Sequence, residues 1–251
     1  MMKRALVDLA FLSTFLLNSA FALAQDARLT YDVATVKLAT CGGPKSNRAS
    51  ADQLISTNQT LKQLVVLAYS VQPYQVTGPA WMESVCVDIT AKYPPGTKFS
   101  DRWLMLRSLL EDRFKLAVHH ESKEMSGYAL IIDKGDFKLK PADPGEGSTT
   151  GGNQGRVWTF RARKIEMSTL AYELADSLGD VVVDMTGLHG VYDFQLRWAS
   201  DDMTSPGGSD ANEAPSIFTA LHDTLGLSLQ RQKVPVDTIM VDHIERVPTE
   251  N

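Results

Sequence analysis

The chain has 251 residues, 43% of them hydrophobic, and carries 25 Lys and Arg against 30 Asp and Glu, for a formal net charge of −5 at pH 7. This acidic balance disfavours nucleic acid as a partner, because phosphate binding needs a basic surface. The length suffices to bury a substantial core, either as one domain or as two small ones in contact.

The first 24 residues have the pattern of a signal peptide. A basic start at residues 3–4 precedes a mostly apolar run over residues 5–17, and Ala22 and Ala24 are the small residues that signal peptidase requires at the −3 and −1 positions. We therefore expect cleavage after Ala24 and an exported mature chain, either periplasmic or extracellular.

One charge, Asp8, interrupts the apolar run and opposes insertion into a membrane. An uncleaved anchor and an ordinary N-terminal helix therefore stay open as alternatives. No later segment approaches about 18 uninterrupted apolar residues. Contact with a membrane is thus expected only through this first segment, and only if it is not cleaved.

The chain has two cysteines, Cys41 and Cys86. In an oxidising compartment they can form one disulfide, which would stabilise the fold by roughly 4 kcal/mol by constraining the unfolded chain. Two buried free thiols are the alternative. A zinc site is disfavoured because the sequence lacks paired cysteine spacings.

Residues 25–142 predict a first αβ half with a leading strand. The spacing of apolar residues predicts, in chain order, strands at 29–38 and 54–56, a helix after Thr60, a strand at 85–90, a helix at 103–114 and strands at 116–120 and 128–133. Thr60 is a favoured N-cap residue. The polar stretch 121–127 is expected to be the turn of a hairpin.

A stretch rich in Gly, Ser and Thr at 143–155 is predicted to be a flexible linker to a second αβ half, residues 156–251. The apolar spacing there predicts, in chain order, a strand at 157–165, a helix at 170–178, strands at 181–184 and 192–198, a helix at 216–225 and strands at 227–231 and 238–242. A loose insertion at 201–214 stands where the first half has 94–100.

The two halves repeat one order of elements, which suggests an internal duplication. The run Thr60-Leu61-Lys62-Gln63-Leu64 opens the first helix pattern, and Thr169-Leu170-Ala171-Tyr172-Glu173-Leu174 opens the second. Phe114 and Leu225 are expected to be buried at equivalent corners, where the second helix of each half passes into the next strand. The predicted fold is α+β, with two related helix-strand-strand-helix-strand-strand halves and antiparallel or mixed sheets.

Several short motifs stand in order along nearly the whole mature chain: Thr60-Leu61-Lys62-Gln63-Leu64, Gly78-Pro79-Ala80-Trp81, Asp88-Ile89-Thr90-Ala91-Lys92, Glu111-Asp112-Arg113-Phe114, Asp184-Met185-Thr186-Gly187-Leu188 and Val241-Asp242-His243-Ile244-Glu245. They resemble a family of exported "soil-associated" proteins of unknown function, abundant in soil bacteria. The resemblance implies export, a stand-alone module in many cases, and in some relatives attachment behind a membrane-embedded sensor peptidase. It implies no catalytic residues.

Among polar residues, His119 and Glu121 are the best candidates for a metal site, since imidazole and carboxylate are zinc ligands. On a strand, however, His119 and His120 face opposite sides and cannot chelate one ion together. A half-exposed strand with a hydrogen-bonded histidine is therefore the preferred interpretation, and no cofactor is expected.

A second polar set comprises Asp184, His189, Asp193 and His243. Asp184 precedes a glycine-containing turn, where an aspartate usually accepts hydrogen bonds from backbone amides. A serine-histidine-aspartate triad is disfavoured because no serine lies in a Gly-x-Ser-x-Gly turn.

The sequence thus favours an exported, non-catalytic binding or interaction module. Its partner would be an unknown protein, peptide or small ligand in the cell envelope, bound at a sheet edge or between the halves. The alternatives are a metal-assisted hydrolase and a sensor-type domain that works with a membrane peptidase. The tryptophans are expected to pack in the core or between the halves rather than to form a sugar platform, and they are Trp81, Trp103, Trp158 and Trp198.

Overall fold

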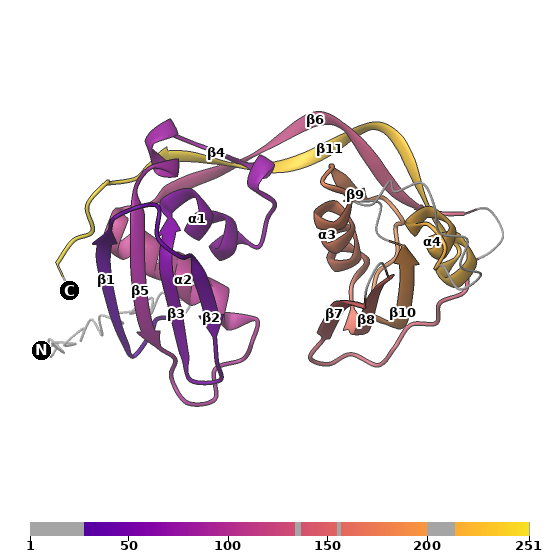
Figure 1. Cartoon of the computed structure of the whole chain (residues 1–251), viewed down its shortest axis with the longest axis horizontal. Helices are drawn as coiled ribbons and strands as arrows, with labels where there is room; N and C mark the ends of the chain where they lie inside the picture. Colours follow the sequence, from indigo (N-terminus) through magenta and orange to yellow (C-terminus); the bar gives the residue numbers. More distant parts are fainter. Residues whose placement is uncertain (1–27, 134–136, 155–156, 200–213, 251) are drawn as a thin grey trace, which may run out of the picture.

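The computed structural model describes residues 28–133, 137–154, 157–199 and 214–250. In these residues the chain is an α+β protein of two lobes joined by a long two-stranded ribbon (Figure 1). The predicted signal peptide lies outside the described residues, as does the predicted insertion except for its last residue.

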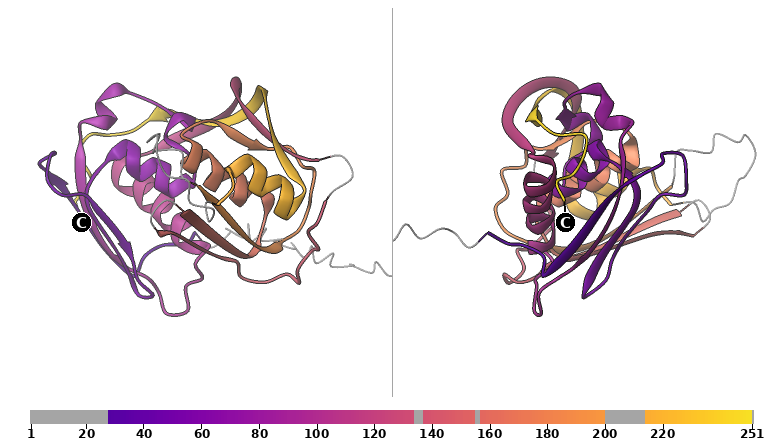
Figure 2. Two further views of the ribbon diagram at one scale, coloured as in Figure 1. Left: turned by 45° about the vertical axis from the view of Figure 1, so that its right-hand side comes forward. Right: turned by 90° about the vertical axis from the view of Figure 1, so that its left-hand side faces the viewer.

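Lobe one contains a four-stranded antiparallel sheet with helices packed on one face (Figure 2). In the order β1-β5-β3-β2, its strands are β1 Val33–Ala39, β5 Cys86–Lys92, β3 Gln53–Thr60 and β2 Ser46–Ala49. The remaining elements are α1 Leu61–Tyr69, η1 Pro73–Gln75, β4 Val76–Thr77, η2 Ala80–Glu83 and α2 Asp101–Phe114. The strands alternate as predicted, so Leu54, Ile89 and Ala91 are buried under the helices.

Helix α1 begins after the predicted N-cap. Thr60 Oγ1 accepts a hydrogen bond from the Gln63 N–H at 3.2 Å, and Gln63 Oε1 accepts one from the Thr60 N–H at 3.0 Å. This capping box satisfies amide groups that the first helical turn leaves without backbone partners. The prediction for Thr60 is confirmed.

Lobe two contains the sheet β10-β8-β7, with β10 Tyr192–Ala199, β8 Val157–Ile165 and β7 Ser148–Gln154. Its other elements are α3 Met167–Leu178, β9 Val182–Asp184 and α4 Ile217–Leu225. Strand β7 occupies most of the stretch that was predicted to be a flexible linker. It pairs with β8 through backbone groups, so its glycines and polar side chains can all stay exposed at the sheet edge.

The ribbon consists of β6 Ala117–Ile132 and β11 Leu227–His243, paired antiparallel over their length. The predicted hairpin turn at 121–127 is therefore wrong, and 227–242 is likewise one strand. The middle of β6 is polar because it crosses between the lobes in solvent. Gly127 is not a turn residue: a Cβ there would lie 2.6 Å from Val181, so glycine allows the close approach of β9.

Each ribbon strand leaves one lobe and ends in the other (Figure 1). Strand β6 follows α2 of lobe one and contributes Leu130 to the core of lobe two, where β9 pairs with it in parallel. Strand β11 follows α4 of lobe two and contributes Ile239 to the core of lobe one, where β4 pairs with it in parallel. Both lobes are therefore completed by residues from the other part of the chain.

The lobes share the element order strand, helix, short strand, strand, helix, long strand. Buried positions recur with the same spacing, as Leu61, Leu64, Val65 and Ala68 in α1 against Met167, Leu170, Ala171 and Leu174 in α3, and as Leu106, Leu109, Leu110 and Phe114 in α2 against Ile217, Ala220, Leu221 and Leu225 in α4. The predicted match of Thr60 with Thr169 is wrong, because α3 already begins at Met167 and its N-cap is Glu166.

A backbone detail also occurs in both lobes. Asn58 and Lys164 adopt left-handed conformations, with φ of 53° and 50°, just before the first helix of each lobe. The Asn58 N–H donates to Asp88 Oδ1 at 2.7 Å, and the Lys164 N–H donates to Asp193 Oδ1 at 2.6 Å. The two aspartates lie on β5 and β10, so the same bulge is held by the same kind of hydrogen bond twice.

The predicted pair Cys41 and Cys86 is at disulfide-bonding distance, with a Cα–Cα distance of 5.3 Å. The bond joins the loop after β1 to the start of β5. Among the described residues, no helix is both long and apolar enough to cross a bilayer.

Candidate functional site

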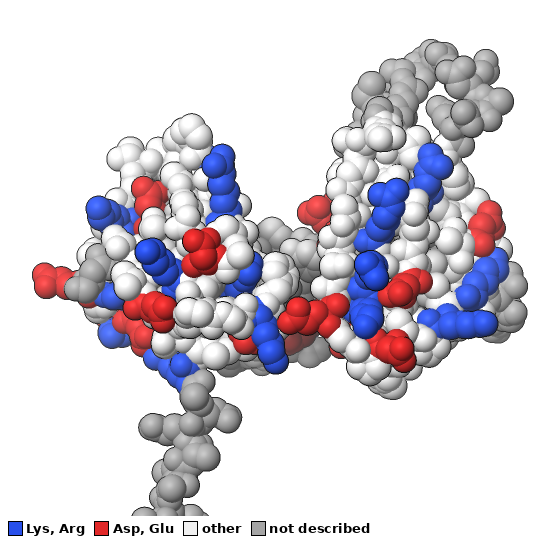
Figure 3. All heavy atoms as spheres, turned by 90° about the horizontal axis from the view of Figure 1, so that it is seen from below, with Lys and Arg blue, Asp and Glu red and all other residues white. Residues whose placement is uncertain are grey.

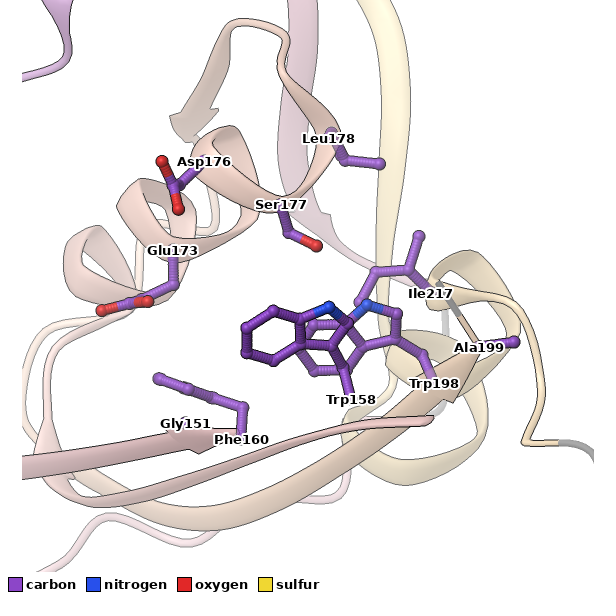
Figure 4. A pocket seen from close by; sticks show the side chains of 10 residues that line it. All are labelled: Gly151, Trp158, Phe160, Glu173, Asp176, Ser177, Leu178, Trp198, Ala199 and Ile217. Carbon is purple, nitrogen blue, oxygen red and sulfur yellow. The ribbon is translucent and has the colours of Figure 1, made fainter. Parts of the chain in front are cut away.

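A cavity of about 320 Å³ opens in lobe two between the inner face of the sheet and helix α3 (Figure 4). The first residue of α4, Ile217, borders it on a third side. The lining residues are Gly151, Trp158, Phe160, Glu173, Asp176, Ser177, Leu178, Trp198, Ala199 and Ile217. We call this cavity the tryptophan pocket.

The sheet contributes the aromatic wall of the pocket. Trp158 and Trp198 are direct cross-strand partners on β8 and β10. Their rings lie nearly parallel, at an interplanar angle of 14° and a centroid distance of 6.4 Å. Phe160 follows Trp158 on the same face. The expectation of plain core packing for these tryptophans is thus incomplete, because they also line a cavity. The sequence placed each tryptophan on a predicted strand but carried no signal for the register that brings the two face to face.

Helix α3 contributes a polar wall. Glu173, Asp176 and Ser177 are spaced three and four residues apart, which places them on one helix face, and in Figure 4 they lie across the pocket from the indoles. Burial, and secondarily the nearby Asp176 charge, raise the pKa of the Glu173 carboxyl. Within the described part of the chain, neither carboxylate forms an ion pair with a lysine or arginine.

A second hollow lies between the lobes beneath the ribbon, with a volume of about 420 Å³ (Figure 3). Two hydrogen bonds from η1 and the residue before it join its walls. Gln72 Nε2 donates to the Tyr172 carbonyl at 3.1 Å, and Gln75 Nε2 donates to the Asp237 carbonyl at 2.7 Å. These contacts fix lobe one against α3 and the ribbon. The residues around this hollow therefore serve to keep the two lobes in place.

The two histidines among the predicted candidates on the ribbon pair with acids on the opposite strand. His119 Nδ1 lies 2.8 Å from Asp242, and His120 Nδ1 lies 2.8 Å from Asp237. Glu121 pairs with Lys123 at 3.2 Å. Each histidine therefore has its own aspartate, and both are exposed.

The second predicted set lies in lobe two and at the end of the ribbon. Asp184 accepts hydrogen bonds from the Thr186 N–H at 3.0 Å and hydroxyl at 2.7 Å, which confirms its predicted turn role. Asp193 holds the Lys164 amide, and His189 and His243 are exposed. Across residues 28–133, 137–154, 157–199 and 214–250, no group of three or more metal-binding side chains is found. The absence of a catalytic centre stays a prediction.

A protein-family model described as "Protein of unknown function (DUF3738)" matches residues 62–244. This span runs from α1 to the end of the ribbon and contains the whole tryptophan pocket. The searches of curated proteins and of solved structures found no match.

Proposed function

The chain belongs to DUF3738, a family of proteins of unknown function, and we propose that it is an exported, non-catalytic binding module whose ligand occupies the tryptophan pocket. The observation that carries this proposal is the cavity of about 320 Å³ with a wall of aromatic rings opposite a wall of carboxylates. Concave sites that combine apolar rings with a few polar groups are the usual form of small-molecule sites.

Export rests on the leader pattern of residues 1–24 and is supported by the Cys41–Cys86 bond, since disulfides persist in oxidising compartments. The finer assignment to the exported soil-associated proteins belongs to the same proposal. Its motifs span nearly the same residues as the family match. N-terminal sequencing of protein recovered outside the cytoplasm should begin at Gln25, and an intact Met1 would contradict export by cleavage.

Internal duplication is also part of the proposal. It is supported by the recurring buried positions and by the equivalent hydrogen bonds of Asp88 and Asp193. At the centre of the ribbon Glu124 pairs with Pro235, and these residues stand at the same distance after Phe114 and Leu225. A duplicated unit arranged about a two-fold axis through this pair would produce that register.

The binding function can be tested on the purified mature protein with a panel of sugars, amino acids, alkylammonium salts and small aromatic compounds. We expect at least one class to raise the melting temperature, and Trp158→Ala to abolish that rise. Ser177→Trp leaves both indoles in place and blocks the entrance of the pocket from an exposed position. This variant should therefore also abolish the rise in melting temperature, but without loss of folding. Trp81→Ala in lobe one is the matched control. A panel without any binder, or a binder indifferent to both pocket variants, contradicts the proposal.

A further inference from the structure

We infer that the tryptophan pocket takes a small organic cation, an alkylammonium or guanidinium group, an inference that rests on the binding function proposed above. Three observations support it, namely the charge of the lining, the place of Asp176 on its helix, and the arrangement of the equivalent residues in lobe one.

Among the residues that the structure describes, the lining contains two carboxylates and neither lysine nor arginine. Glu173 is half-buried and Asp176 is exposed beside it, and two neighbouring negative charges favour a cation over a neutral or anionic ligand. Asp176 also lies in the last turn of α3, where the helix dipole disfavours negative charge. Its position is unfavourable for the helix alone, and a bound cation would offset it.

Lobe one has an internal cation over the aromatic ring that is equivalent to Trp198. Tyr93 lies five residues after Asp88, as Trp198 lies five residues after Asp193, and each aspartate holds the bulge of its lobe. Tyr93 packs against Tyr31, which precedes β1, at a centroid distance of 5.5 Å, whereas Trp198 packs against Trp158 on β8. Both rings thus have an aromatic neighbour, although that neighbour comes from a different part of the fold in each lobe.

In lobe one the guanidinium of Arg102 lies over the Tyr93 ring, 4.9 Å from its centroid. Arg102 belongs to the first turn of α2. Helix α4 begins at Ile217, which corresponds to Leu106, and the described residues directly before it, 214–216, are not helical. Indole rings bind cations better than a phenol ring does, and no arginine of the described residues lies over Trp158 or Trp198.

The volume limits the size of the ligand. About 320 Å³ lies at the low end of the range of roughly 300–1,000 Å³ for ligand pockets. It suits a free quaternary ammonium compound or one arginine or lysine side chain of a peptide. These two sources share their chemistry, and the test separates them.

Calorimetric titration with choline is the first measurement. Its control is the neutral isostere in which carbon replaces the nitrogen. We expect choline to bind at least about tenfold more tightly than the isostere, because only the cation gains from the rings and the carboxylates. Glu173→Gln with Asp176→Asn should remove this preference, while Glu146→Gln, an exposed acid outside the pocket, should not. A peptide with one arginine that binds more tightly than choline assigns the side-chain source.

The pH dependence provides a second readout. Glu173 lies near Asp176 and next to Tyr172 on its own helix, and the described lining residues of the sheet and of α4 do not ionise. As the pH falls, Glu173 takes up a proton before an ordinary glutamate would, so choline should bind more weakly, and Glu173→Gln should flatten this dependence.

Two results overturn the inference and leave the binding function intact. In the first result, the neutral isostere binds as tightly as choline. In the second, a neutral sugar binds and choline does not. In both results Trp158→Ala abolishes the binding. If no compound of the wider panel binds either, the binding function fails as well.

Discussion

The two lobes differ most at the start of their second helices. In lobe one, the first turn of α2 covers the end of the sheet: Met105 is buried with Tyr93 in the core, and Arg102 lies over the Tyr93 ring. In lobe two the described helix begins later, and the same end of the sheet borders the tryptophan pocket. One arrangement of strands and helices therefore yields a closed core in one lobe and an open cavity in the other.

This difference separates the residues that maintain the shared fold from those that make the pocket. Residues at equivalent positions in both lobes, such as Phe114 and Leu225, should matter for stability alone. Residues without a counterpart of like chemistry, such as Glu173 and Trp158, should matter for binding. The predictions below test this division, from the largest expected effect to the smallest.

The helix-to-strand corners should be the most sensitive positions. Phe114 and Leu225 are both fully buried. Phe114→Ala should lower the free energy of unfolding by roughly 3–5 kcal/mol and Leu225→Ala by roughly 2–5 kcal/mol, measured by denaturant titration, because each leaves a cavity. A loss below about 1 kcal/mol at one corner only would break the equivalence of the lobes.

The disulfide should stabilise lobe one selectively. Mass spectrometry of the unreduced protein should show the two-hydrogen deficit of a Cys41–Cys86 bond. The double change to serine should cost roughly 2–4 kcal/mol. Hydrogen exchange should then increase first in β1 and β5. Equal increases in lobe two would mean that the lobes unfold together.

The two aspartates at the bulges should behave alike. Asp88→Asn and Asp193→Asn each weaken a charge-assisted hydrogen bond to a left-handed residue, and each should cost about 1–2 kcal/mol. Neither should change ligand affinity. Asp101→Asn, an acid of lobe one outside both bulges, is the control, and a cost confined to one lobe would count against duplication.

Arg102 should contribute less. Arg102→Met keeps much of the apolar stem but removes the charge over Tyr93, and should cost about 1 kcal/mol. Guanidinium at millimolar concentration should restore part of this loss in the variant, provided that the site accepts an external cation. Restoration that is equal in the wild type would point to a general salt effect.

Glu173→Gln should have the smallest effect on stability, and in the opposite direction. The folded-state pKa of Glu173 is raised, so the group favours folding at pH below its ordinary value of 4.5 and loses this contribution as the pH rises through the folded value. The glutamine variant should therefore melt at a slightly higher temperature at pH 7 and lose this advantage in acid. Glu146→Gln should show no such change.

Local patterns in the sequence predicted the elements of both lobes well. Alternation of apolar and polar residues placed β5 and β10, and the N-cap preference placed the start of α1. The predicted burial of Phe114 and Leu225 at the helix-to-strand corners is confirmed. These features depend on side chains within a few residues of each other, which is the range that periodicity reports.

Long-range pairing was not predictable from such patterns. The polar middle of β6 resembles a turn because its partner β11 lies far away in sequence and its side chains face solvent. Strand β7 escaped prediction although its partner β8 follows it closely, because its own glycines and polar residues are all exposed and show no apolar alternation. The tryptophan pocket depends on the register that sets Trp158 opposite Trp198 and on an α3 face across from it. None of these relations is visible along one segment.

The crossed strands have a consequence for the time course of folding. Strand β11 and Ile244 complete lobe one, and the Glu245 N–H donates to the Phe114 carbonyl at 2.7 Å. A chain threaded N-terminus first through a membrane channel would thus hold its earliest lobe unfinished until the last residues had emerged. Contacts so distant along the chain favour slow folding. Lobe one should therefore become protease-resistant only after the last residues of the chain have emerged.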